Sequence, residues 1–460
     1  MFKSKEHIFR TIEIAWPCIL EYMLVSMVVY ADSFMVSSLG TNATASVGIN
    51  SSVTWLINAL SSGLAIGGTV LVANNLGAGR REASNEAAEQ TLGVSFILSI
   101  IISIFMISVA PYIPKLMGAE PEILADAGAY LRIYSLSIFA HFCGLIVSGI
   151  LRGAGDTKTP MKVQITANIV HIILNIFLIY GPWTLKLFGG INIGVWGAGL
   201  GVRGAAISTA ISQTAAGLVL CFLVFDKRQI VHVEFKNLFK FKPHVIKKIL
   251  SIGAPAAGER VSISVGQLLF QKIVSGLGTV AIAANFLAIM AESISYMPAN
   301  GLSVSSTTLV GQSLGAKNKD DALTYAKINI GAAAIFGTIS LIILVVFSEF
   351  LLGIMSKDLA VIKVGASSLK FMAMAEPLFC VNIVLVGILR AAGDTKIPLI
   401  SSVVGMWLVR IASAYFFAYT LGMGLQGAWL GMALDHVSRF VVLIFRYLKK
   451  QWLESNLVEE

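Results

Sequence analysis

Charged residues are scarce in this chain. Only 13% of its 460 residues are Asp, Glu, Lys or Arg, whereas 56% are hydrophobic, and the mean hydropathy is +0.80. A soluble globular domain carries roughly 25% charged residues. The low charge therefore excludes a soluble domain and indicates a protein that crosses the lipid bilayer many times.

Cysteine and the common catalytic motifs are also lacking. The four cysteines lie in apolar stretches without metal-ligand spacing, so we predict neither a disulfide framework nor a metal site. The chain has no H-E-x-x-H, nucleophile elbow or dinucleotide fingerprint, and GAGDTK at 153–158 lacks the spacing of a phosphate-binding loop. We predict that the protein is not an enzyme, holds no cofactor and is not driven by ATP.

What is present is a series of long apolar runs. Twelve stretches are long enough to cross a bilayer as helices. They occupy roughly residues 12–37, 46–74, 89–112, 126–150, 160–181, 204–225, 246–275, 281–310, 326–349, 364–388, 398–420 and 427–448.

The formal net charge of +9 has a topological explanation. Lys and Arg gather before the first run, after the last, between the sixth and seventh, and in alternate loops between them. Because loops rich in Lys and Arg stay in the cytoplasm, we predict that both termini and the middle loop are cytoplasmic. We expect a plasma (inner) membrane location, a monomer embedded in the bilayer and no nucleic-acid partner.

An internal repeat organises the chain. Pro17 and Glu21 recur 238 residues later as Pro255 and Glu259, and GILRGAGDTKTP at 149–160 recurs as GILRAAGDTKIP at 387–398. The register breaks only after the fifth apolar run, where the first half carries fifteen extra residues in a Gly-rich outer loop.

The repeat predicts an all-α membrane protein with two parallel six-helix repeats around a central cleft. The first lobe covers 1–225 and the second 246–450, with a basic linker at 226–245 and a cytoplasmic tail at 451–460. The linker mixes Lys with Phe and Val, which is compatible with an amphipathic helix on the membrane surface and equally with a plain tether.

The first apolar run contains two acids, Glu21 and Asp32. Eleven residues make about three helical turns, so both side chains project from nearly the same face, ~16 Å apart. A carboxylate inside a membrane helix is costly and usually marks an ion or substrate path. The same argument applies to Glu259 and Glu292 in the second half.

The two R-x-A-G-D-T-K-x-P segments, the GQSLGA turn and the double six-helix repeat resemble the multidrug and toxic compound extrusion (MATE) family over about residues 10–450. The resemblance implies export of organic, often cationic, compounds driven by inward Na⁺ or H⁺, through a cleft that opens alternately to the two sides. It also implies that Asp32 takes part in ion coupling.

The fifth apolar run departs from the family pattern. The family often has Asn, three residues and then Asp, where this sequence has His171 and Asn175. The second acid of the ion site is therefore missing, and His171 can supply titration instead. We expect Asp32, His171 and Asn175 to form the ion-coupling site, with H⁺ favoured over Na⁺ as the coupling ion.

Four residues are candidates for the substrate cavity: Glu21, Glu259, Glu292 and Tyr30. Acids and aromatic faces suit an organic cation. The alternatives, which the residues favour, are structural ion pairs for the acids and helix packing for the tyrosine. Arg410 needs a partner inside the membrane, for which Glu292 or Glu259 is available. Asp435 and Arg439 are four residues apart and can pair on one helix.

The two repeated Gly turns carry Arg152 with Asp156, and Arg390 with Asp394. We interpret them as structural hinge loops, in which Arg and Asp pair across the turn and fix the angle between successive helices.

The sequence thus favours a cation-coupled antiporter that exports small organic, cationic compounds by alternating access. The alternative is a lipid-linked sugar or lipid flippase of related architecture, for which we expect a more strongly basic cavity and helices beyond twelve. A channel remains a further alternative that ion–substrate stoichiometry distinguishes.

Overall fold

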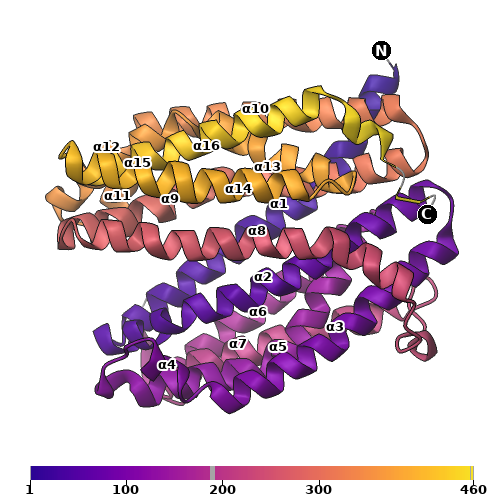
Figure 1. Cartoon of the computed structure of the whole chain (residues 1–460). Coiled ribbons are helices and arrows are strands. Elements are labelled where there is room, and N and C mark those ends of the chain that lie inside the picture. The colour runs from indigo at the N-terminus through magenta and orange to yellow at the C-terminus, as the bar shows by residue number, and fades with distance from the viewer. Residues whose placement is uncertain (1, 187–191, 456, 459–460) are drawn as a thin grey trace.

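The computed structural model describes residues 2–186, 192–455 and 457–458. It consists of two helical lobes that lie side by side (Figure 1), the first formed by the N-terminal half and the second by the C-terminal half. Apart from one hairpin, the described secondary structure is helical, which confirms the predicted all-α fold.

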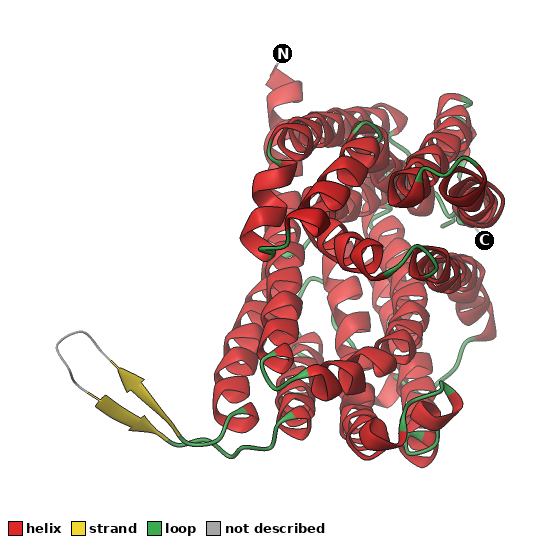
Figure 2. Ribbon diagram, turned by 90° about the vertical axis from the view of Figure 1, so that its left-hand side faces the viewer, coloured by secondary structure: helices red, strands yellow, loops and turns green. Residues whose placement is uncertain are grey.

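The N-terminal lobe contains six long helices and one short one. These are α1 (Phe2–Ser37), α2 (Thr41–Gly77), α3 (Arg81–Val109), α4 (Ile113–Leu116), α5 (Pro121–Gly153), α6 (Lys158–Ile179) and α7 (Val202–Val224). The fifteen extra residues between α6 and α7 contribute an antiparallel hairpin of β1 (Trp183–Lys186) and β2 (Asn192–Val195), which projects from the bundle (Figure 2).

The C-terminal lobe repeats this plan with more interruptions. Its helices are α8 (Pro243–Ser275), α9 (Thr279–Gly315), α10 (Lys319–Val346), α11 (Ser348–Met355), α12 (Leu359–Ala373), α13 (Glu376–Ala391), α14 (Lys396–Val403), α15 (Ala412–Tyr415) and α16 (Gly424–Leu448). Two π-helical segments, η2 (Val404–Ile411) and η3 (Phe416–Thr420), make α14 and α15 one span.

Ten helical spans are long and apolar enough to cross a membrane, and the pair α12 and α13 brings the count to eleven among the described residues. The 33-residue α8 takes the place of α1 in the second repeat and completes the twelve-helix layout. The tenth span, predicted as one helix over 364–388, is instead bent by 55°. Pro377, at the start of α13, cannot continue a helix from the preceding residues.

The same turns end equivalent helices in the two lobes. Gly40 and Gly278 precede α2 and α9 with φ of 112° and 98°, and Gly155 and Gly393 lie before α6 and α14 with φ of 91° and 76°. Only glycine adopts these backbone angles without strain. The glycines therefore fix identical turns at positions 238 residues apart.

The lobes meet where α1 packs on α9 and α2 on α8. A Cβ atom on Gly63 would lie 2.4 Å from Cβ of Ala257, and one on Gly301 would lie 2.4 Å from Cγ1 of Ile19. Small residues let membrane helices approach this closely. Since Gly63 and Gly301 are equivalent in the repeat, the interface is close to two-fold symmetric.

One end of the bundle carries the start of α1, the linker and the turns 154–157 and 392–395, and we call it the basic end. The opposite end, with β1 and β2, is the hairpin end. At the basic end the lobes are joined by two equivalent hydrogen bonds. Asn74 Nδ2 donates to the Ala391 carbonyl at 3.0 Å, and Gln312 Nε2 donates to the Gly153 carbonyl at 3.1 Å.

The linker is neither an amphipathic helix nor a loose tether. Before α8 begins at Pro243, its helical piece is the single turn η1 (Phe235–Asn237), and its Val231, Val233 and Leu238 side chains are buried. On α3, Glu89 accepts hydrogen bonds from the Glu234 amide and from Asn237. The linker thus packs against α3 as part of the N-terminal lobe.

The residues after α16 cross the joint between the lobes at the basic end. A short turn, η4 (Gln451–Glu454), buries Trp452. Beyond it, the Leu457 carbonyl accepts from Lys248 at 3.4 Å and the Val458 carbonyl accepts from Arg80 at 2.6 Å. The C-terminal segment therefore binds to α8 of one lobe and to the turn before α3 of the other.

Candidate ion site and central cavity

The three predicted ion-site residues lie together in the N-terminal lobe. Asn175 Nδ2 donates to Asp32 Oδ1 at 2.7 Å, and His171 Nε2 lies 3.3 Å from the same oxygen. Ser208 of α7 donates to the Asn175 carbonyl oxygen, and Ser212 lies 3.2 Å from His171 Nδ1. Helices α1, α6 and α7 thus converge on one carboxylate.

The Asp32 carboxylate has polar neighbours but no permanent counter-charge. Its side chain is 20% exposed, and among the described residues no Lys or Arg forms an ion pair with it. A carboxylate inside a membrane protein without a fixed Lys or Arg partner can bind a proton or a small cation. The juxtaposition is a structural fact, whereas the ion-coupling role of the three residues stays a prediction.

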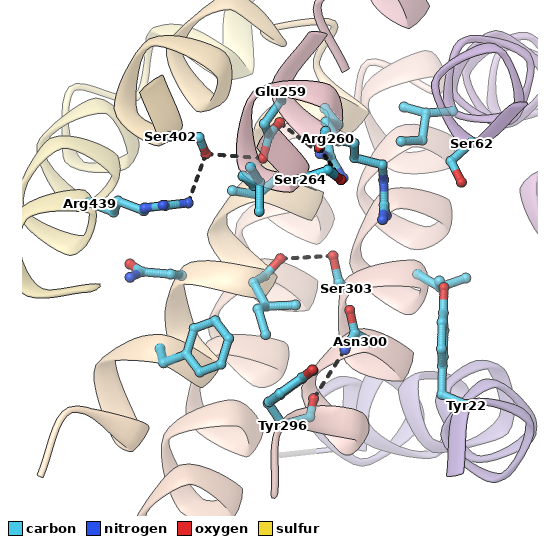
Figure 3. Close-up of a pocket in the computed structure, with 18 of the residues that line it drawn as sticks. Tyr22, Ser62, Glu259, Arg260, Ser264, Tyr296, Asn300, Ser303, Ser402 and Arg439 are labelled. Carbon is cyan, nitrogen blue, oxygen red and sulfur yellow. Dashed lines mark hydrogen bonds and ion pairs between the residues drawn. The ribbon is translucent and has the colours of Figure 1, made fainter. Parts of the chain in front are cut away.

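A cavity of about 590 Å³ lies between the lobes. Helices α1, α2 and α5 contribute the N-terminal side, and α8, α9, α13, α14, η2 and α16 contribute the larger C-terminal side. Figure 3 shows polar side chains along its wall, with Glu259 and Arg260 from α8, and Tyr296, Asn300 and Ser303 from α9.

The four predicted cavity residues have different positions. Glu259 and Glu292 line the cavity, whereas Glu21 and Tyr30 are not among its lining residues. Tyr30 instead joins α1 to α9, because its hydroxyl donates to the Met290 carbonyl at 3.3 Å and contacts the Ser293 hydroxyl.

The predicted Arg–Asp pairs across the two Gly turns are wrong. Arg152 forms its ion pair with Glu21, and Arg390 Nη2 lies 2.8 Å from Glu259 Oε2. Asp156 accepts instead from the Thr159 amide at 3.0 Å, within the turn at the start of α6. The left-handed glycine before each Asp turns the acid toward the next helix and away from the Arg.

Asp394 follows the same rule in the second repeat. It accepts from the Ile397 amide at 3.4 Å and from Arg446 Nε at 2.6 Å. The two hinge-loop acids therefore cap the helices that follow them, and the two arginines join their helices to α1 and α8.

A charged network fills the C-terminal side of the cavity wall. Asp435 is completely buried and accepts from Arg410 Nε at 2.8 Å and from Arg439 Nε at 2.6 Å. The pairing of Asp435 with Arg439 follows the prediction. The partner of Arg410 does not, since it is Asp435 rather than Glu292 or Glu259.

The network continues toward the basic end. Arg439 Nη1 donates to the Ser402 hydroxyl at 3.1 Å, and Ser402 donates to Glu259 Oε1 at 3.3 Å. Arg410 also donates to His436 Nε2 at 3.0 Å. The π-helical segment η2 carries Arg410, and such segments often occur at functional sites.

Three residues that line or adjoin the cavity were missed by the sequence analysis. Arg260 follows Glu259 directly in the chain, and adjacent helical residues face different directions, so no pairing pattern marked it as a candidate. Glu376 is completely buried, with its carboxylate 3.9 Å from Cys380 Sγ. An acid directly before a proline in an apolar run could have marked it as a candidate. No sequence pattern marked His436 as a cavity residue.

Two repeated six-helix lobes around a polar cavity define the architecture of a secondary membrane transporter. A family model described as MatE matches residues 17–177 and 255–416, one segment in each lobe. The chain therefore belongs to the MatE family, the multidrug and toxic compound extrusion transporters.

Relatives cover nearly the whole chain. The probable multidrug resistance protein NorM of Thermotoga maritima is 29% identical over 445 residues, 96% of this chain and 92% of the relative. The uncharacterized transporter YisQ of Bacillus subtilis is 26% identical over 455 residues, 99% of this chain and 97% of the relative.

Solved structures share the fold. A crystal structure of MATE in complex with MaL6 superimposes with a TM-score of 0.89 at 22% identity, covering 98% of both chains. An outward-facing multidrug resistance MATE family transporter gives a TM-score of 0.87 at 22% identity, covering 98% of this chain and 97% of that one.

Proposed function

We propose that the protein is a proton-coupled antiporter that exports small organic compounds by alternating access. The observation that carries this proposal is the Asp32 carboxylate, held by Asn175 and His171 without a Lys or Arg counter-charge among the described residues. Membership of the MatE family and the relative described as a probable multidrug resistance protein support efflux as the activity.

The arrangement of donors favours H⁺ over Na⁺. A sodium ion needs several oxygen ligands, but Asn175 turns its NH₂ group toward Asp32 and its oxygen toward Ser208. The other neighbour of Asp32, His171, offers a ring nitrogen. Protonation of Asp32 would remove its charge and weaken its bond to Asn175, which would change how α1 packs on α6.

The two ends of the bundle support a topology for this cycle. Both termini and the linker lie at the basic end, and positively charged loops face the cytoplasm. We therefore place the basic end in the cytoplasm and a monomer in the plasma membrane. The hydrogen bonds of Asn74 and Gln312 between the lobes then close the cytoplasmic side.

Glu292 supports the binding of organic cations. It lines the cavity, and among the described residues it forms no ion pair. A carboxylate beside the rings of Tyr296 and Phe379, which also line the cavity, suits a compound with a basic group.

A lipid-linked sugar or lipid flippase remains the second candidate. Five arginines line the cavity: Arg152, Arg260, Arg390, Arg410 and Arg439. This number fits the basic cavity expected of a flippase, but four of the five are paired with acids. A solved Pyrococcus furiosus transporter with a TM-score of 0.87 is described as having a binding pocket of reverse polarity that suggests a different function.

Reconstitution into proteoliposomes tests the proposal. Dye efflux would be measured under an imposed pH gradient or an imposed Na⁺ gradient, with Asp32→Asn beside the parent. We expect the pH gradient alone to drive efflux, and Asp32→Asn to lose it. As a control, Asp126→Asn removes an exposed acid whose partner, Arg203, is also exposed, and it should transport normally.

Equal transport by Asp32→Asn and the parent would refute the role of Asp32. Efflux driven by Na⁺ alone would replace the proposed ion. Translocation of a fluorescent lipid that neither gradient drives would favour the flippase.

A further inference from the structure

Arg260 has an unusual environment in the central cavity. Its side chain extends from α8 into the space that Tyr22, Ser62 and Ser303 border (Figure 3), and it is exposed there. No carboxylate among the described residues lies within ion-pair distance of its guanidinium. Its backbone carbonyl accepts a hydrogen bond from the Ser264 hydroxyl at 2.9 Å, which leaves the guanidinium uninvolved.

Each of the other arginines that line the cavity has an acidic partner. Arg152 is paired with Glu21, Arg390 with Glu259, and Arg410 and Arg439 share Asp435. These pairs compensate the charges of the four arginines within the protein itself. Among the described lining residues, Arg260 is therefore the guanidinium whose charge is left for a ligand.

Glu292 and Arg260 line the cavity without an ion-pair partner among the described residues, and they differ in whether a proton can remove their charge. A carboxylic acid such as Glu292 can be neutralised by a proton, whereas a guanidinium keeps its charge at any working pH. A bound ligand displaces water from the charges that it covers, and a charge that loses its water without gaining a partner is costly. A purely cationic ligand would leave Arg260 uncompensated, but a ligand with an acidic group would satisfy it.

We propose that the cavity selects compounds that carry a carboxylate, sulfonate or phosphate group, with Arg260 as its counter-ion. A planar guanidinium matches the two oxygens of such groups with parallel hydrogen bonds. Polar side chains border the same space, including Asn300, Ser62 and Ser303. The preferred ligand is a zwitterion whose basic group faces Glu292. This inference rests on the proposed transport function for its physiological meaning, but it concerns binding.

A matched pair of dyes tests the proposal. A rhodamine with a free carboxylate is a zwitterion, and its methyl ester is a cation with the same ring system. Binding of each would be measured by fluorescence anisotropy with the full-length protein in phosphatidylcholine nanodiscs. We expect the carboxylate form to bind the parent more tightly than the ester.

Variants of Arg260 identify the contact. Arg260→Gln should weaken binding of the carboxylate dye by about tenfold or more, as expected for loss of a charged hydrogen-bonded pair, and should change binding of the ester little or improve it. Arg260→Lys should keep part of the affinity. Lys272→Gln removes a positive charge from the same helix outside the cavity lining and should bind both dyes like the parent.

The outcomes separate this inference from the proposed function. If the parent binds the ester as well as the carboxylate dye, or if Arg260→Gln weakens both dyes equally, the inference is overturned whatever the efflux assay shows. If the dyes bind as expected but no gradient drives efflux, the anion site stands and the antiporter proposal fails. A thermal melt of each variant guards against misfolding.

The acidic group can belong to a soluble compound or to a lipid. Nanodiscs with increasing phosphatidylglycerol distinguish these sources. Displacement of the carboxylate dye by the anionic lipid in the parent would assign the site to a lipid headgroup. Undiminished dye binding would assign it to a soluble amphipathic anion.

Discussion

Arg390 and Glu259 form an ion pair of 2.8 Å that joins α13 to α8, and Arg152 and Glu21 form the same pair between α5 and α1. In both pairs the two residues are 131 positions apart, and both arginines stand in the repeated Gly-turn segments. The repeat therefore reproduces a contact between distant helices as well as a sequence motif. In each lobe the pair ties the helix at the lobe interface to the helix that enters the hinge turn.

Breaking this pair should destabilise the protein. Glu259→Gln would leave the Arg390 guanidinium buried without a counter-charge, which costs about 3–5 kcal/mol. Arg390→Gln should cost a similar amount, and the double variant should cost less than the sum by about 1–3 kcal/mol. Unfolding in SDS titrations gives these free energies.

The exposed pair of Lys370 and Glu349, at 3.7 Å, provides the control. Glu349→Gln should change stability by less than about 1 kcal/mol, because water screens exposed pairs. Strict additivity of the two buried substitutions would contradict the assigned contact.

Asn175→Ala should impair ion coupling. It removes the 2.7 Å donor to Asp32 and the side-chain oxygen that accepts from Ser208. Hydrogen bonds to charged groups contribute about 1.5–3 kcal/mol, so we expect gradient-driven efflux to fall roughly tenfold or more. Asn168→Ala, two turns earlier on α6, removes an amide that contacts Gln164, and its efflux should resemble that of the parent. Equal loss in both variants would point to general damage of α6.

Gly77→Ala and Gly315→Ala should each prevent tight closure of the basic end. A Cβ atom would lie 1.9 Å from the Gln312 carbonyl oxygen in the first variant and 1.9 Å from the Asn74 carbonyl oxygen in the second. The lobes must therefore separate, which a thiol reagent would detect at a cysteine introduced nearby. Gly48→Ala is the control, because Gly48 lies on the same helix as Gly77 with open space around it, and it should label like the parent. The prediction fails if all three variants label alike.

Asp435→Asn should be among the most damaging single substitutions. It would leave Arg410 and Arg439 facing each other without their shared carboxylate, at a cost of about 3–5 kcal/mol. Thermal melting of the purified protein should show a clearly lower midpoint. Asp126→Asn, which affects an exposed pair, should melt like the parent, and an unchanged midpoint for Asp435→Asn would refute the assignment.

Much of the fold could be predicted from the sequence, because the internal repeat and the long apolar runs are strong patterns. A constant offset of 238 placed Gly155 with Gly393 and Glu21 with Glu259, and both equivalences hold in the structure. The bend before Pro377 was missed because the apolar run continues across it. Hydropathy measures length and composition, and it does not report the direction of a helix axis.

Contacts between distant helices were harder to predict than contacts within one helix. Asp435 and Arg439 share a helix face, so their spacing identified them. Arg410 reaches the same acid from another span, and nothing in the sequence singles out Asp435 over Glu292. The meeting of Asp32 with Asn175 was expected from family resemblance rather than from any spacing.

The C-terminal segment that crosses the joint between the lobes offers a reporter of the proposed alternating access. Lys248 and Arg80 hold its carbonyl groups from opposite sides of that joint, so we expect a rocking movement of the lobes to release one of them. A protease recognition sequence placed in this segment should then be cut faster when the lobes separate. Its cleavage rate would report how often that separation occurs, without a labelled substrate.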